Sequence, residues 1–394
     1  MLQSLGYIFI LGYFLGYLFE KIRIPNIIGY LVAGIVLGPF AMNVLDDGLI
    51  AVAGDLRQIA LLIILTRAGL SLKFKDFKKM GRKIFIVPFL PACFEMLATF
   101  LIAQWFFNLQ AMDALLLAAV VASSSPAVVV PRMVKLINEN YGTKKGIPQL
   151  ILAGDSIDNV FNVVVFATVL TMQTSGDFAF SNFIVVPIAV ISGIVTGLLI
   201  GYLIAKLLKL LQAPNEIKTL LLLSVGFVLL AFEERIDQFI PFSALISVMA
   251  MGVAILHFAP KNASVISEQL SKLWVGAQII LFALVGSTVD ISYATTISFK
   301  AVLMLVLVLI ARSAGILICH LGSDYTRKER FFCVMSEVPK ATVQAAIGGI
   351  PLAMGLASGE LILSISVISI LFTAPLGAFL IDTFYQKLLT KDDN

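Results

Sequence analysis

Long apolar runs dominate the sequence, each about 20 residues in length and nearly free of charged side chains. A bilayer core is about 30 Å thick, and an α-helix needs about 20 apolar residues to cross it. Lipid offers the backbone no hydrogen-bond partners, so only helices and closed barrels span a membrane. Barrel strands alternate apolar and polar residues, and these runs do not. With 59% hydrophobic and only 13% charged residues, the chain is predicted to be an all-α polytopic membrane protein.

About thirteen such runs can be placed, and we expect one transmembrane helix in each. They cover residues 3–19, 25–43, 50–72, 84–107, 111–136, 148–172, 182–210, 216–232, 241–259, 264–288, 293–320, 329–356 and 360–385. The first run has no basic segment before it and no small-residue cleavage site after it. We therefore interpret it as a spanning helix and not as a signal peptide.

Charged residues between the runs predict the orientation. If there are thirteen crossings, one side of the membrane receives Lys73, Lys75, Lys78, Lys79, Arg82, Lys83, Arg132, Lys135, Lys144, Lys145, Lys206, Lys209, Lys218, Lys261, Arg327, Lys328, Arg330, Lys387 and Lys391. The other side receives mostly acids, namely Asp46, Asp47, Asp113, Asp177, Asp237 and Asp290. Lysine and arginine accumulate in cytoplasmic loops. We therefore expect an outside N-terminus and a cytoplasmic C-terminus in the cytoplasmic (inner) membrane.

The run at 148–172 carries a polar stripe. Asp155, Asp158, Asn159 and Asn162 are spaced i, i+3, i+4 and i+7, which places all four on one helix face. A charge at membrane depth costs at least about 2.5–3.5 kcal/mol, so such residues face a packed interior or a water-filled cavity. The stripe therefore indicates an ion or proton pathway. The alternative is a polar pair that only holds helices together.

Two other runs are interrupted in corresponding ways. Ser123–Ser124–Ser125 precedes Pro126, with Pro131 further on, and Ser336–Glu337–Val338 precedes Pro339–Lys340. Proline inside a helix removes one hydrogen bond and blocks another. In transporters, paired broken helices in the two halves indicate a binding site near the bilayer midplane. A simple kink is the alternative for either break taken alone, but two breaks with polar neighbours favour a functional role.

Arg312 lies far from either end of the run at 293–320. A guanidinium stays charged and needs a partner at this depth, and Asp158 or Asp155 is the expected one. Snorkelling of the side chain to the interface is the alternative. Arg67 and Glu95 also lie within or near apolar runs. Two interpretations of them stay open, a structural pair and a pair of gating groups. Cysteines at 93, 319 and 333 predict neither a disulfide framework nor a metal site, and no cofactor is expected.

Together these residues resemble the monovalent cation:proton antiporters of the second family, which includes bacterial sodium/proton and potassium/proton exchangers. The resemblance covers nearly the whole chain. It rests on the order and spacing of segments 67–72, 125–132, 154–166, 241–243, 248–252, Arg312–Ser313 and 339–344.

The resemblance implies an inverted-repeat fold with two crossed discontinuous helices, a dimerisation part and a core. In the family, the helix matching 148–172 carries an Asp-Asp or Asn-Asp pair whose second member binds the ion, and a basic residue pairs with the first. Arg312 occupies the basic position, but Asn159 occupies that of the ion-binding Asp. Asn159 cannot carry a proton, and Asp155, one turn away, is a candidate for a relocated carboxylate. Asn159 is then either a natural variant or an engineered change. Asp155 and Asn162 are also unusual for the family, which favours a natural variant of the site.

On this basis we divide the chain into four segments. Residues 1–83 form the first helices, with a scaffold part and the start of the core, and 84–172 form a core half with the first break and the polar stripe. Residues 182–259 form scaffold and linking helices, and 264–385 form the second half with Arg312 and the second break.

The predicted function is secondary active transport, with Na⁺ or K⁺ exchanged for H⁺ by alternating access, and not enzymatic catalysis. The predicted ion- and proton-binding residues are Asp155, Asp158, Asn159, Ser124 and Ser125, with the cation at Asp158, Asn159 and Asp155. The charge-compensating residues are Arg312, Lys340 and Glu337. Expected partners are the cation, the proton, the bilayer and a second copy of the chain, and not nucleic acid. A passive channel or a transport-inactive sensor that lost proton coupling through Asn159 is the alternative.

Overall fold

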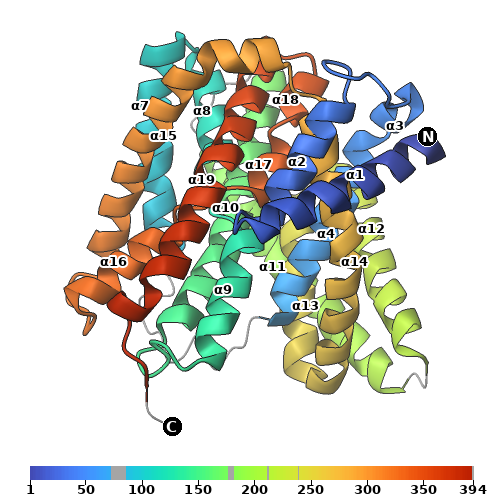
Figure 1. Cartoon of the computed structure of the whole chain (residues 1–394). Helices are drawn as coiled ribbons and strands as arrows, with labels where there is room; N and C mark the ends of the chain where they lie inside the picture. The colour runs from blue at the N-terminus through green and yellow to red at the C-terminus, as the bar shows by residue number, and fades with distance from the viewer. Residues whose placement is uncertain (72–85, 176–181, 211–212, 238, 393–394) are drawn as a thin grey trace. The chain divides into compact units, whose positions relative to one another are not determined.

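The computed structural model describes residues 1–71, 86–175, 182–210, 213–237 and 239–392 (Figure 1). Within these residues every element is an α-helix, apart from one isolated β-bridge between Tyr141 and Lys391. The all-α prediction is confirmed. The basic loop with Lys73, Lys75, Lys78, Lys79, Arg82 and Lys83, the acid at Asp177 and the last residue of the segment 67–72 lie outside the described residues.

The chain divides into two compact units. Unit 1 comprises residues 1–53, 79–169 and 279–394, and unit 2 comprises 54–78 and 170–278. Unit 1 contains α1 (Leu2–Lys21), α2 (Asn26–Leu37), α3 (Asp47–Ala51), α7 (Leu90–Phe107), α8 (Ala111–Val121), α9 (Pro126–Asn138), most of α10 (Ile147–Ser175), α15 (Ile291–Cys319), α16 (Arg327–Ser336), α17 (Thr342–Ile347), α18 (Ile350–Ala353) and α19 (Gly359–Leu388). Unit 2 contains α4 (Ala53–Ser71), α11 (Asn182–Leu210), α12 (Asn215–Asp237), α13 (Ala244–Phe258) and most of α14 (Pro260–Ser287).

Every predicted apolar run contains a helix, and the runs at 111–136 and 329–356 are broken as expected. In the described part of the chain, nine helical spans are long and apolar enough to cross a membrane, and three shorter apolar helices accompany them. One of the shorter helices is α2, which ends at Leu37, before the predicted end at 43. Gly38 is extended because a residue that precedes proline, here Pro39, avoids the helical conformation.

Small residues let helices approach closely inside each unit. In unit 1, a side chain at Gly34 of α2 would collide with the backbone of Ala283 in α14. In unit 2, Gly197 of α11 would meet Ser247 and Ala250 of α13 in the same way. Such contacts are how helices gain van der Waals packing in lipid, where no hydrophobic force drives them together.

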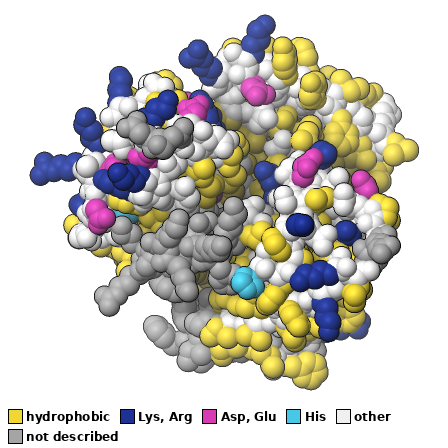
Figure 2. Space-filling model, turned by 90° about the horizontal axis from the view of Figure 1, so that it is seen from below, with side chains coloured by type: hydrophobic (Ala, Val, Ile, Leu, Met, Phe, Trp, Pro, Cys, Tyr) yellow, Lys and Arg dark blue, Asp and Glu magenta, His cyan; other side chains and the backbone are white. Residues whose placement is uncertain are grey.

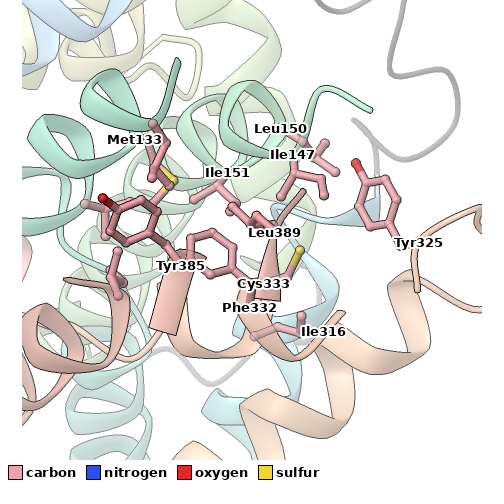
Figure 3. Close-up of a cluster of buried hydrophobic side chains, with 13 residues drawn as sticks. Met133, Ile147, Leu150, Ile151, Ile316, Tyr325, Phe332, Cys333, Tyr385 and Leu389 are labelled. Atoms are coloured by element: carbon pink, nitrogen blue, oxygen red, sulfur yellow. The ribbon is translucent and has the colours of Figure 1, made fainter. Parts of the chain in front are cut away.

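An apolar cluster joins five helices of unit 1 (Figure 3). Its buried members are Val129, Met133, Leu136, Ile147, Leu150, Ile151, Ile316, Tyr325, Phe332, Cys333, Ile381, Tyr385 and Leu389, from α9, α10, α15, α16, α19 and the adjoining loops. Ile151 lies one turn before Asp155, and Cys333 lies one turn before Glu337. The cluster therefore fixes α10, which carries the polar stripe, and α16, which leads into the second break.

Basic side chains are widespread on the face at which α19 ends, and acidic ones are fewer (Figure 2). In unit 1, the loops that join α9 to α10 and α15 to α16 lie at this lower end in Figure 1. They and the start of α16 carry the exposed residues Lys144, Arg327 and Lys328.

Candidate ion-binding site

The first break lies between α8 and α9. Helix α8 ends at Val121, Ser125 is extended, and Pro126 takes the first position of α9. Proline fits that position because its missing N–H would have no helical partner there. The three serines at 123–125 are fully buried, so their backbone and hydroxyl groups are available inside unit 1.

The second break lies between α16 and α17, and it meets the first. Gln344 Nε2 donates to the carbonyl oxygens of Val120 and Ser123, each at 2.9 Å. The hydroxyls of Ser125 and Thr342 are 3.3 Å apart. Because the breaks leave carbonyl groups without helical donors, these side-chain bonds satisfy groups that lipid would leave unpaired.

The polar stripe of α10 faces these breaks and is buried. Asp155, Asp158, Asn159 and Asn162 are each at most 3% exposed. Ser124 donates to Asp158 Oδ2 from its backbone N–H at 3.1 Å, and its hydroxyl lies within reach of both Asp158 and Asp155. The other oxygen of Asp158 accepts from Asn162 Nδ2 at 2.8 Å. Both oxygens of Asp158 are therefore in use.

Arg312 reaches this cluster from α15 and is 2% exposed. Its Nη1 donates to Glu95 Oε2 at 2.9 Å, and its Nη2 donates to Asp158 Oδ2 at 3.0 Å and to Glu337 Oε2 at 2.5 Å. The predicted pairing of Arg312 with an aspartate of the stripe is confirmed, with Asp158 as partner, and snorkelling is excluded. One guanidinium thus serves three carboxylates through its fixed fork of donors.

Lys340, in the second break, is fully buried. Its Nζ lies 2.9 Å from both oxygens of Glu95. Glu95, on α7, therefore has two cationic partners in unit 1, Arg312 and Lys340. The signal for Glu95 was an acid in an apolar run, but a linear sequence does not show which cations reach it.

Asn159 is held in place by two hydrogen bonds. Its Oδ1 accepts from the hydroxyl of Ser123, and its Nδ2 donates to the backbone oxygen of Asp155 at 2.6 Å. Ser123 was not among the predicted site residues, although it adjoins two that were. The backbone of the break turns Ser123 and Ser124 towards α10, whereas Ser125 contacts Thr342.

Two oxygens of the stripe are buried without a hydrogen-bond partner, Asp155 Oδ2 and Asn162 Oδ1. Buried polar groups in native proteins are nearly always satisfied, so each unsatisfied group needs an explanation. Among the described residues, no group of three or more His, Cys, Asp and Glu side chains is arranged to hold a metal ion. The structure thus places Asp155, Asp158, Asn159, Ser124, Arg312, Glu337 and Lys340 in one buried cluster with Ser123, Glu95 and Asn162, whereas Ser125 contacts Thr342 of the second break.

Comparisons with known proteins place these features in context. The family model described as sodium/hydrogen exchanger, transmembrane, matches residues 8–387. Sodium/hydrogen exchanger 9B2 of Homo sapiens is 30% identical over 383 residues, which are 93% of this chain and 70% of that protein. Sodium/hydrogen exchanger 9B1 of Homo sapiens is 29% identical over 357 residues, 85% of this chain and 67% of that protein.

The fold also has a match among solved structures. The sodium proton antiporter MjNhaP1 from Methanocaldococcus jannaschii, at pH 8, superposes with a TM-score of 0.86 and 18% identity over 98% of both chains. At this identity the match establishes the antiporter fold alone.

Proposed function

The chain belongs to the sodium/hydrogen exchanger family and is a multi-pass membrane sodium/proton antiporter, and we propose that Asp155 is the carboxylate through which it exchanges the two ions. The observation that carries this proposal is the buried, unpartnered oxygen Asp155 Oδ2. Asp158 and Glu95 both contact Arg312, but within the described part of the chain the Asp155 carboxylate accepts a hydrogen bond only from the Ser124 hydroxyl. A buried carboxylate without a cationic partner is costly unless a proton or cation neutralises it.

The other residues have fixed roles in this proposal. Arg312 and Lys340 neutralise Glu95 and Asp158, of which Glu95 joins α7 to the second break and Asp158 joins α10 to the first. Asn159 supplies a neutral oxygen, and Ser124 positions Asp155. The predicted roles of Asp158 and Asn159 as direct cation ligands require one of their present hydrogen bonds to open. The proposed cargo is sodium, with potassium as the alternative cation to be tested.

The subfamily and the transport mechanism are proposed from the sequence motifs, and the membrane orientation is proposed from the distribution of basic residues. The motifs at 67–72, 125–132 and 339–344 favour the second family of monovalent cation:proton antiporters, and with it alternating access by a core that moves against a homodimeric scaffold. The basic face in Figure 2 supports a cytoplasmic C-terminus in the cytoplasmic membrane. Reporter fusions at the two ends of the chain test this orientation, and two ends on one side would contradict it.

Ion flux in proteoliposomes tests the function. We expect added Na⁺ to drive protons across the membrane in the wild type, and Asp155→Asn to abolish this flux because the amide cannot exchange a proton for a cation. Asp382→Asn is the matched control, since Asp382 is a half-exposed carboxylate paired with Arg132 outside the site.

Three outcomes contradict the proposal in different ways. Conduction of cations without proton movement in the wild type would indicate a channel, and absence of both fluxes would indicate a sensor. Unchanged exchange in Asp155→Asn, with loss only in Asp158→Asn, would move the exchanging role to Asp158.

A further inference from the structure

We propose that Glu337, in the second break, is a second carboxylate ligand of the cargo cation and supplies the negative charge that Asn159 lacks. This inference rests on the proposed function and adds a residue to the site. It also assigns Glu337 a role different from the charge compensation that its sequence position suggested. Three independent features of the cluster support it.

The first feature is the balance of charge. Among the described residues, the cluster contains four carboxylates, Asp155, Asp158, Glu95 and Glu337, but only two cationic side chains, Arg312 and Lys340. With every group ionised, it lacks two positive charges. A buried cluster does not keep such an excess, so protons or cargo cations must complete it.

The second feature is the unequal neutralisation of the four carboxylates. Glu95 contacts both cations, and Asp158 combines Arg312 with donors from Ser124 and Asn162. The two groups left over are Asp155, which forms no ion pair among the described residues, and Glu337, which shares Arg312 with Glu95 and Asp158. The missing charge therefore belongs to Asp155 and Glu337.

The third feature is the position of Glu337. It caps the end of α16, at the start of the non-helical segment before α17, and its side chain is 9% exposed, against 0% for Glu95 and 2% for Asp158. The Ser124 hydroxyl contacts both Asp155 and Asp158 Oδ2, and Arg312 Nη2 donates to Asp158 Oδ2 and to Glu337 Oε2. Glu337 is thus joined to Asp155 through Arg312, Asp158 and Ser124, and it is the carboxylate of the three Arg312 partners that an incoming ion reaches most easily.

Asn159 cannot replace Glu337 in this role. Its amide oxygen already accepts from Ser123, and its nitrogen is committed to the backbone of Asp155. A cation bound between Asp155 and Glu337 would be held by one carboxylate from α10 and one from the break before α17. This arrangement differs from two adjacent acids on one helix.

The test is the dependence of exchange on sodium concentration in proteoliposomes. We expect Glu337→Gln to raise the half-saturating Na⁺ concentration at least about tenfold, the loss that follows from removing one charged ligand. Glu337→Asp, which keeps the charge on a shorter side chain, should restore much of the affinity and change the preference among Li⁺, Na⁺ and K⁺. Asp382→Asn should leave both measurements unchanged.

A charge-relocation experiment separates a ligand from a mere partner of Arg312. If the site needs one more negative charge than Asp155 provides, Asn159→Asp in the Glu337→Gln background should lower the half-saturating concentration again. The two changes together would then be non-additive, as expected for residues that share one ligand.

Two results would overturn the inference. One is a half-saturating concentration in Glu337→Gln equal to that of the wild type. The other is an equal rise of the half-saturating Na⁺ concentration in Glu337→Asp and Glu337→Gln, without any change in the preference among Li⁺, Na⁺ and K⁺. A wild type that exchanges no sodium would instead refute the proposed function itself, so the two failures are distinguishable.

Discussion

At the scale of single residues, Arg312 shows what the sequence reveals and what it leaves open. Its depth in an apolar run predicted a carboxylate partner, and the spacing of α10 supplied Asp158. Its simultaneous contacts with Glu95 and Glu337 were not predictable, because these residues come from α7 and α16 and no local pattern sets the distance between them. The roles of Ser123 and Ser125 likewise depended on backbone angles in the break.

Arg312 also carries a prediction about stability. Removal of its charge in Arg312→Gln leaves three buried carboxylates facing one another, and we expect a loss of about 3–5 kcal/mol in the free energy of unfolding. Arg132→Gln is the control, because its partner Asp382 is 48% exposed and such pairs contribute about 0–1 kcal/mol. Thermal unfolding in detergent, followed by tryptophan fluorescence, measures both. Equal melting temperatures for the two variants would contradict the assigned role.

At the scale of elements, the two breaks were predictable and their contact was not. Proline after a polar stretch marked each break, but only the fold brings Gln344 of α17 to the carbonyl oxygens of Val120 in α8 and Ser123 in the first break. Gln344→Leu keeps the shape of the side chain and leaves two buried carbonyl groups without this donor, at a cost of about 1–3 kcal/mol. Gln104→Leu is the control, since Gln104 Nε2 donates to the carbonyl oxygen of Phe100 in its own helix and joins no break.

Thermal unfolding of the two glutamine variants measures this difference. We expect Gln344→Leu to melt at a clearly lower temperature than Gln104→Leu and to exchange ions more slowly, because the break loses its fixed shape. A Gln344→Leu variant as stable as the wild type would show that the breaks do not depend on each other.

At the scale of the whole molecule, the apolar runs were sufficient to predict the helices, since helix length in a bilayer is set by the bilayer itself. They were not sufficient to predict the division into two units, because the units combine segments far apart in the sequence. The complete polar cluster lies in unit 1, with α7, α10, α15 and both broken helices. Cation and proton are therefore expected to compete inside one compact unit.

Proton release on sodium binding tests this central claim most directly. Purified protein in weakly buffered detergent solution, near neutral pH, is mixed with NaCl, and a pH indicator reports the protons set free. We predict release from the wild type and from Asp382→Asn, and none from Asp155→Asn, because the same carboxylate holds either ion. Sodium binding without proton release in the wild type, or equal release in Asp155→Asn, would contradict the account.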